Sequence, residues 1–275
     1  MTQVEELKIL LRMLPIWAST AFVWTALTQM ETFSVLEGAT LNGHIVGSFN
    51  FPPASLSVFE LINVLLILPL YDRFFVPIMR RVTGHECGIT TLQRIGTGIV
   101  FSILAMLVAG LVELKRIRVA KAYDLLDQPD VTIPMSIFWL VPQYFFRGST
   151  EIFTQIGQLE FFYNEVPDNM RSLGTALYLS TIAVGHFLST FLVTVINDAT
   201  GHDGNETWIS DNLNRSKLYY FYWLLAGLSV ANFLIYLICA HWYRYKPSVK
   251  KFNVPENQQD GLSFHSDTSG KSRVD

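Results

Sequence analysis

Glu151 draws attention because it lies inside a long apolar stretch, after FWLVPQYFF and before IFTQIGQ. Counting back from Phe162 at about 1.5 Å per helical residue puts Glu151 about 16 Å inside that stretch. A charged residue at the centre of a bilayer costs about 2.5 to 3.5 kcal/mol on insertion scales, so it usually faces a cavity or a partner. We therefore interpret Glu151 as a carboxylate that binds a proton or a substrate beside a water-filled cavity.

Arg147 offers a second explanation for the same carboxylate. It precedes Glu151 by four residues, and residues with this spacing share one face of a helix. The two side chains could therefore form an ion pair that only neutralises itself. Both interpretations stay open from the sequence alone.

Further polar residues interrupt the other apolar stretches. Glu60, in SLSVFELINVLL, either lines a cavity or extends its carboxylate to the membrane surface. His186 is a candidate site residue because histidine is the side chain that can change charge near physiological pH, although a lone histidine in a membrane more often only forms a hydrogen bond in the packing. Gln29 is favoured as a binding residue over Glu31, which could reach water.

Trp139 and Pro142 belong to the same stretch as Glu151. The Trp139 ring could form a wall of a substrate site or simply pack in the core. Pro142 lacks a backbone N–H, so it predicts a kink in the helix.

Four charged residues mark a predicted loop at residues 71–84, in YDRFFVPIMRRVTG. Either they form a salt-bridge latch that opens and closes one side of the protein, or they only anchor the loop in the cytosol. These residues are Asp72, Arg73, Arg80 and Arg81.

The composition indicates a membrane protein that positions these side chains on helices. The 275 residues are 50% hydrophobic and only 16% charged. A membrane-spanning helix needs about 20 largely apolar residues. Six such stretches predict an all-α protein with six transmembrane helices, at residues 14–32, 54–76, 92–112, 134–162, 173–196 and 219–242.

Basic residues and glycosylation motifs orient these helices. With a cytosolic N-terminus, ten Lys and Arg residues fall inside and six outside, including Lys115 and Arg116 outside. Asn205 and Asn214 lie in N-x-S/T motifs of one outer loop and are predicted glycosylation sites. The membrane bundle is expected to cover residues 1–246, and the polar segment 247–275 is expected to be a disordered cytosolic tail.

Several function classes are not supported by the sequence. A net charge of −3 provides no basic excess for nucleic acid binding. We find no zinc-ligand spacing, phosphate-binding loop or nucleophile elbow, so we expect neither an enzyme nor a metal site.

The longer motifs carry a family resemblance. They are FNFPPASLSVFE, YDRFFVP, TTLQRIGTG, FWLVPQYFFRGSTEIFTQIGQLEFFYNEVPDNMRS, ALYLST and NLNRSKLYYFYWLLA. Up to about residue 246 the chain resembles the C-terminal half of a plant nitrate/peptide transporter, in the proton-dependent oligopeptide transporter branch of the major facilitator superfamily. Such transporters have two six-helix halves with the substrate site between them.

The resemblance implies roles for individual residues. Glu151 matches the family carboxylate that is implicated in binding the peptide amino terminus and in proton coupling. Arg147 stands where the family usually has an apolar residue, and His186 where it often has Asn. The first predicted helix lacks both the tyrosine of peptide-transporting relatives and the histidine used for nitrate.

The function implied by this resemblance is proton-coupled symport of small peptides, or of related solutes such as nitrate. Protons are the only coupling ion expected, with no cofactor, in the plasma membrane or vacuolar membrane. The expected partners are the lipid bilayer and an N-terminal six-helix half or a full-length relative. The alternative is a transport-inactive half that acts as an interaction or regulatory partner.

Overall fold

The computed structural model describes residues 3–44, 50–83, 88–129, 131–201, 207–210 and 212–243. The described helices belong to one packed unit, Met1–Tyr243. The predicted disordered tail at 247–275 and the predicted glycosylation site Asn205 lie outside the described residues.

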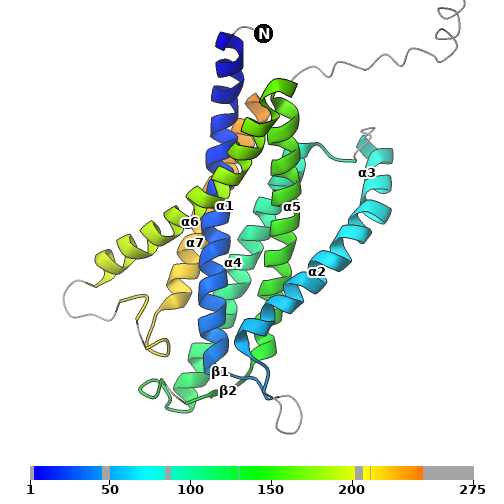
Figure 1. Ribbon diagram of the computed structural model, residues 1–275. Coiled ribbons are helices and arrows are strands. Elements are labelled where there is room, and N and C mark those ends of the chain that lie inside the picture. Colours follow the sequence, from blue (N-terminus) through cyan, green and yellow to red (C-terminus); the bar gives the residue numbers. More distant parts are fainter. Residues whose placement is uncertain are drawn as a thin grey trace, which may run out of the picture. The chain divides into compact units, whose positions relative to one another are not determined.

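Long helices make up most of the described chain (Figure 1). They are α1 (Gln3–Thr40), α2 (Ser57–Leu70), α4 (Thr91–Ala122), α5 (Val141–Glu165), α6 (Arg171–Thr200) and α7 (Leu218–Trp242). Shorter helical segments are η1 (Pro53–Leu56), the π-helix η2 (Tyr71–Phe75), α3 (Val76–Thr83), η3 (Ile137–Leu140) and η4 (Asp168–Met170). Two short strands, β1 (Leu41–Asn42) and β2 (Ile133–Ser136), pair in parallel.

Five segments of the described chain are long and apolar enough to cross a membrane. They are Leu7–Thr40, Pro53–Arg81, Thr91–Ala122, Arg171–Thr200 and Leu218–Trp242. These segments coincide with five of the six predicted spans. The remaining one falls on α5, which has 25 residues but carries many polar side chains between its apolar ones.

The predicted helix at 134–162 begins later than expected. Its first residues form strand β2 and the 3₁₀ helix η3, and α5 starts only at Val141. Pro142 therefore lies in the first turn of α5, where a missing backbone N–H leaves no hydrogen bond unmade. The predicted kink at Pro142 is wrong for this reason.

The predicted loop at 71–84 is largely helical. The π-helical turn η2 follows α2 directly and continues into α3, and the Val76 N–H donates to the Tyr71 carbonyl, five residues back. Pro77 comes next, and a proline can neither donate that bond nor fit against the carbonyl one turn earlier. A wider turn just before Pro77 accommodates the proline, so the charged residues of this segment lie on a helix.

The helices pack around α4, which contacts both α5 and α7. Helix α1 packs against α6 and α7, while α2 packs against α5. Gly98 brings α4 close to α5, since a Cβ at Gly98 would lie 2.2 Å from the Thr154 hydroxyl oxygen. This packing brings polar residues of α1, α2 and α5 together.

Candidate functional site

Arg147 of α5 joins three helices through two ion pairs. One Nη atom contacts the Glu60 carboxylate of α2, and the other lies 2.9 Å from the Glu31 carboxylate of α1. The side chains of Arg147 and Glu60 are only 11% and 8% exposed, whereas that of Glu31 is 60% exposed. The arginine is therefore buried on the α2 side and open on the α1 side.

Glu151 completes this group, one turn further along α5. Its half-buried carboxyl lies beside that of Glu60 and acts on it as a like charge. We call Glu31, Glu60, Arg147 and Glu151 the Arg147 cluster. With one guanidinium for three carboxyls, the cluster contains more acidic than basic groups.

The Arg147 cluster also has unused hydrogen-bonding capacity. Two buried polar atoms of the cluster, Arg147 Nε and Glu60 Oε1, have no hydrogen-bond partner in the described part of the chain. The same is true of Oδ1 of Asn63, which lies one turn from Glu60 on α2. Leaving such a buried atom unsatisfied costs about 1 to 3 kcal/mol. A water molecule or a ligand group that formed hydrogen bonds with these atoms would recover that energy.

Gly148 allows α2 to approach α5 at this point. A Cβ at Gly148 would lie 3.0 Å from Asn63 Nδ2 and 3.1 Å from Glu60 Cγ. The Asn63 Nδ2 donates to the Phe145 carbonyl at 2.7 Å and to the Ser149 hydroxyl at 3.2 Å. The backbone of α5 thus fixes the position of Glu60 opposite Arg147.

The ion pair between Arg147 and Glu151, one of the two interpretations that the sequence left open, is not formed in the structure. Arg147 instead uses Glu60 and Glu31, which come from other helices. Helix spacing identifies only neighbours on the same helix, and here the tertiary contacts provide the stronger partners.

Gln29 and Glu31 take different positions from those favoured by the sequence. Gln29 is buried between α1 and α6, where its Nε2 donates to the Ser189 carbonyl at 2.7 Å. Residues two apart on a helix point to nearly opposite sides, so Glu31 faces α5 when Gln29 faces α6. Glu31 is thus the α1 residue in the Arg147 cluster.

His186 and Trp139 contact partners outside the Arg147 cluster. His186 is exposed, and its Nδ1 lies 2.9 Å from the Thr28 hydroxyl across the contact between α1 and α6. Trp139 of η3 is 47% exposed, with the Lys115 ammonium 3.0 Å from the centre of its ring. This is a cation–π contact, which was not visible from the sequence.

The four predicted latch residues are exposed on η2 and α3: Asp72, Arg73, Arg80 and Arg81. Their role as a latch stays a prediction. Next to them, Arg94 of α4 donates to the Tyr71 hydroxyl at 3.1 Å and pairs with Glu160 of α5 at 2.7 Å. These contacts connect η2 to α4 and α5. In the sequence they were indicated only by Arg94 and Glu160, two charged residues inside apolar stretches.

The glycosylation prediction is wrong at Asn214. Its side chain is buried, and its Nδ2, where a glycan would attach, donates to the Leu125 carbonyl at 3.0 Å. Its Oδ1 accepts from Arg116 at 2.9 Å. The amide is therefore enclosed and fully engaged within the protein.

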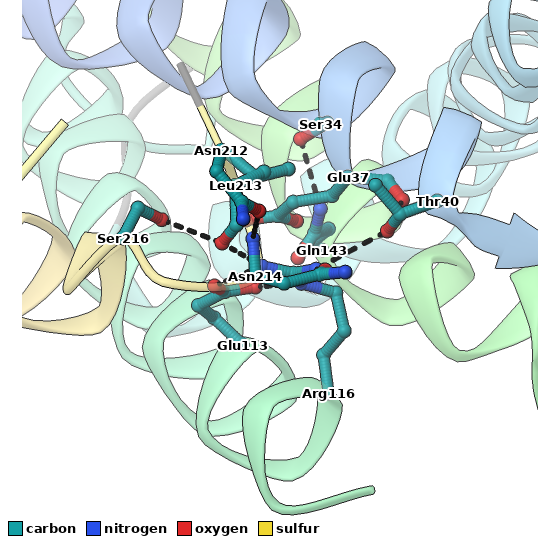
Figure 2. Close-up of polar contacts among 10 residues, drawn as sticks. All are labelled: Ser34, Glu37, Thr40, Glu113, Arg116, Gln143, Asn212, Leu213, Asn214 and Ser216. Atoms are coloured by element: carbon teal, nitrogen blue, oxygen red, sulfur yellow. Dashed lines mark hydrogen bonds and ion pairs between the residues drawn. The ribbon is translucent and has the colours of Figure 1, made fainter. Parts of the chain in front are cut away.

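Arg116 also departs from its predicted position in an outer loop. Because α4 continues to Ala122, Arg116 lies on the helix and is 1% exposed. It meets Glu113 and Glu37 in a second buried charged group (Figure 2). Counting apolar residues ended the predicted helices too early to reveal this group.

Comparisons with known proteins place these helices in a wider context. The family model described as the POT family matches residues 1–209. Protein NRT1/PTR FAMILY 8.2 of Arabidopsis thaliana is 53% identical over 245 residues, which are 89% of this chain and 43% of that protein. Protein NRT1/PTR FAMILY 8.1 of the same plant is 49% identical over 248 residues, covering 90% and 43% of the two chains.

A solved structure shows the same arrangement of helices. The crystal structure of an autoinhibited POT family peptide transporter matches with a TM-score of 0.67 and 20% sequence identity. The match covers 90% of this chain and 43% of that one. The chain thus spans less than half the length of the proteins it resembles.

Proposed function

The chain belongs to the POT family of integral membrane transporters, which are not enzymes, and from this premise we propose that it forms part of a proton-coupled symporter. Its substrates would be small peptides, or related small solutes such as nitrate, and its location the plasma membrane or vacuolar membrane. The observation that carries this proposal is the Arg147 cluster, with its excess of carboxyls and its unpartnered buried atoms.

A small peptide carries opposite charges at its two ends, and the Arg147 cluster offers partners for both. A carboxylate can bind the peptide amino group, and a guanidinium can form two parallel hydrogen bonds with the peptide carboxylate. Nitrate would use the guanidinium alone. The mixed charge of the cluster therefore favours a peptide over a simple anion.

Coupling to protons follows from the competition for Arg147. When Glu60 or Glu151 takes up a proton, the cluster loses one negative charge and holds Arg147 less tightly. Arg147 can then turn toward the substrate carboxylate. When the proton leaves, the ionised carboxylates attract Arg147 again and displace the substrate.

Glu151→Gln tests this mechanism because glutamine keeps the size of the side chain and cannot release a proton. The chain would be joined to the N-terminal half of NRT1/PTR FAMILY 8.2 and reconstituted in lipid vesicles. We expect loss of dipeptide accumulation driven by a proton gradient, while exchange of labelled for unlabelled dipeptide continues.

Glu151→Asp provides the matched control, because it retains an ionisable group and should keep part of the accumulation. Nitrate uptake in the same vesicles compares the two substrate classes. Full gradient-driven accumulation by the Glu151→Gln protein would contradict the proposed role of Glu151.

A second candidate function is suggested by the matched length, because the chain covers only 43% of NRT1/PTR FAMILY 8.2. In this alternative the chain is transport-inactive and binds a full-length relative as a regulatory partner. Uptake by the purified chain in vesicles would reject that role. Co-purification with a full-length relative, without uptake by the chain alone, would support it.

A further inference from the structure

A second buried charged group lies near the C-terminal end of α1, formed by Glu37 of α1 with Glu113 and Arg116 of α4 (Figure 2). Glu37 and Glu113 are fully buried and Arg116 is 1% exposed. The group contains two carboxyls and one guanidinium. Its hydrogen bonds determine which carboxyl balances the arginine.

Every N–H of the Arg116 guanidinium already has an acceptor other than Glu37. A guanidinium has five N–H donors in a fixed arrangement. Two bond to the Glu113 carboxylate, at 2.6 and 2.8 Å. The others bond to Leu213 O at 2.8 Å, Thr40 Oγ1 at 3.2 Å and Asn214 Oδ1 at 2.9 Å. Glu113 is therefore the paired anion, and no N–H of Arg116 remains for Glu37.

Glu37 faces neutral groups on two other helices. Both of its carboxyl oxygens are buried without a hydrogen-bond partner among the described residues. The Tyr222 hydroxyl of α7 and the Gln143 side chain of α5 lie close enough to interact with its carboxyl. Beyond these, the titratable or charged groups that face Glu37 are Glu113, Arg116 and the more distant Tyr144 of α5.

The buried polar atoms without partners around Glu37 distinguish between its two forms. Gln143 Nε2 donates to the Ser34 hydroxyl at 2.8 Å, so its Oε1 is left as a buried acceptor without a donor. An ionised Glu37 can only accept hydrogen bonds, so it supplies no donor for this oxygen. A neutral Glu37 can donate its proton to Gln143 Oε1 and accept from the Tyr222 hydroxyl, which also lacks a partner.

We propose that Glu37 is a proton-binding site, in which a neutral carboxylic acid is enclosed by Gln143, Tyr222 and the paired Glu113 and Arg116. The bound proton removes the negative charge of Glu37. Without it, the buried group would hold two negative charges and one cation, Arg116, whose N–H groups all have other acceptors. This site is separate from the Arg147 cluster and does not depend on the proposed transport function.

Infrared spectroscopy of the purified chain in lipid nanodiscs tests the proposal, because a neutral carboxylic acid has a C=O stretch that a carboxylate lacks. The difference between wild-type and Glu37→Gln spectra at neutral pH isolates the contribution of Glu37 from other carboxyls. We expect a carboxylic acid band, shifted in D₂O, that is present in the wild-type protein and lost in the variant. No difference in this region would overturn the proposal.

Two further variants keep the test decisive if Glu37→Gln does not fold. Tyr222→Phe removes the donor to the Glu37 carbonyl, so the band should move to higher frequency. Glu113→Gln leaves Arg116 without its counter-ion, so Glu37 should ionise and its band should disappear. A spectrum that neither variant changes would also overturn the proposal.

Discussion

Arg116 and Arg147 are both guanidinium groups enclosed by helices, and they differ in how their hydrogen bonds are used. Arg116 has acceptors for all five of its N–H groups and is 1% exposed. Arg147 leaves its Nε without a partner and reaches Glu31, which is 60% exposed. The first arrangement is suited to holding helices together, and the second to exchanging partners.

This difference predicts unequal stability effects when one carboxylate is removed. Glu113→Gln should lower the free energy of unfolding by up to about 3 to 5 kcal/mol, because Arg116 would lose the carboxylate that it bonds twice and Glu37 makes no hydrogen bond to Arg116. Glu31→Gln should change it by at most about 1 kcal/mol, because exposed ion pairs contribute little. Denaturant unfolding of the purified chain in detergent, followed by circular dichroism, measures both values; equal losses would contradict the distinction.

At the level of single residues, the sequence identified members of the Arg147 cluster better than their contacts. Glu60, Arg147 and Glu151 were all singled out as charges inside apolar stretches, and all three belong to the Arg147 cluster. The partners of Arg147 depend on how α2 and α1 pack against α5, and the spacing of residues along one helix does not reveal this packing. Glu37 was missed because it lies beyond the end of the predicted first span.

At the level of elements, apolar content located five spans but not the irregular segments between them. Residues 134–140 are as apolar as a helix, yet they form β2 and η3, because pairing with β1 holds Ile133–Ser136 extended. The helical continuation through η2 depends on the position of Pro77 and on the bond from Val76 to Tyr71. Such details follow from backbone hydrogen bonds, which the average polarity of a segment does not record.

Close approach of α4 and α5 at Gly98 provides a prediction for these elements. Gly98→Ala should destabilise the protein by about 1 to 3 kcal/mol, because the new methyl group would overlap Thr154. Gly227→Ala in α7 is the matched control, since no atom outside the adjoining helix backbone lies within 4 Å of the added Cβ. Alanine favours a helix over glycine by up to about 1 kcal/mol, so the control should be neutral or slightly more stable. Thermal unfolding of both variants in the same detergent checks the pair, and a destabilised control would contradict it.

At the level of the whole molecule, large apolar side chains separate into enclosed and outward-facing sets. Phe221 and Tyr222 of α7 are fully buried, while Phe187 and Phe191 of α6 are 78% and 66% exposed. Such an exposed apolar face carries no hydrophobic penalty when it contacts lipid tails in place of water, as expected for a membrane protein. The chain therefore places its polar contacts between helices and much of its apolar surface outside.

A lipid-soluble carbene probe should report this separation. In vesicles that contain the purified chain, we expect strong labelling at Phe187 and Phe191 and little at Phe221, because the probe reaches only surfaces in contact with acyl chains. Mass spectrometry of peptide fragments measures labelling at each position. Comparable labelling of Phe221 would show that the helices do not pack as described.

The π-helical turn at Tyr71–Phe75 has a geometric consequence for the charged end of the helix that follows. A π-helical turn holds one more residue than an α-helical turn, so all later side chains are set back by about 100° from their directions on an uninterrupted α-helix. Arg80 and Arg81 therefore point to a different side from the one that an uninterrupted helix would give them. Deleting a single residue from this turn would let it close to an ordinary α-helical turn, so both arginines would keep their direction about the helix axis.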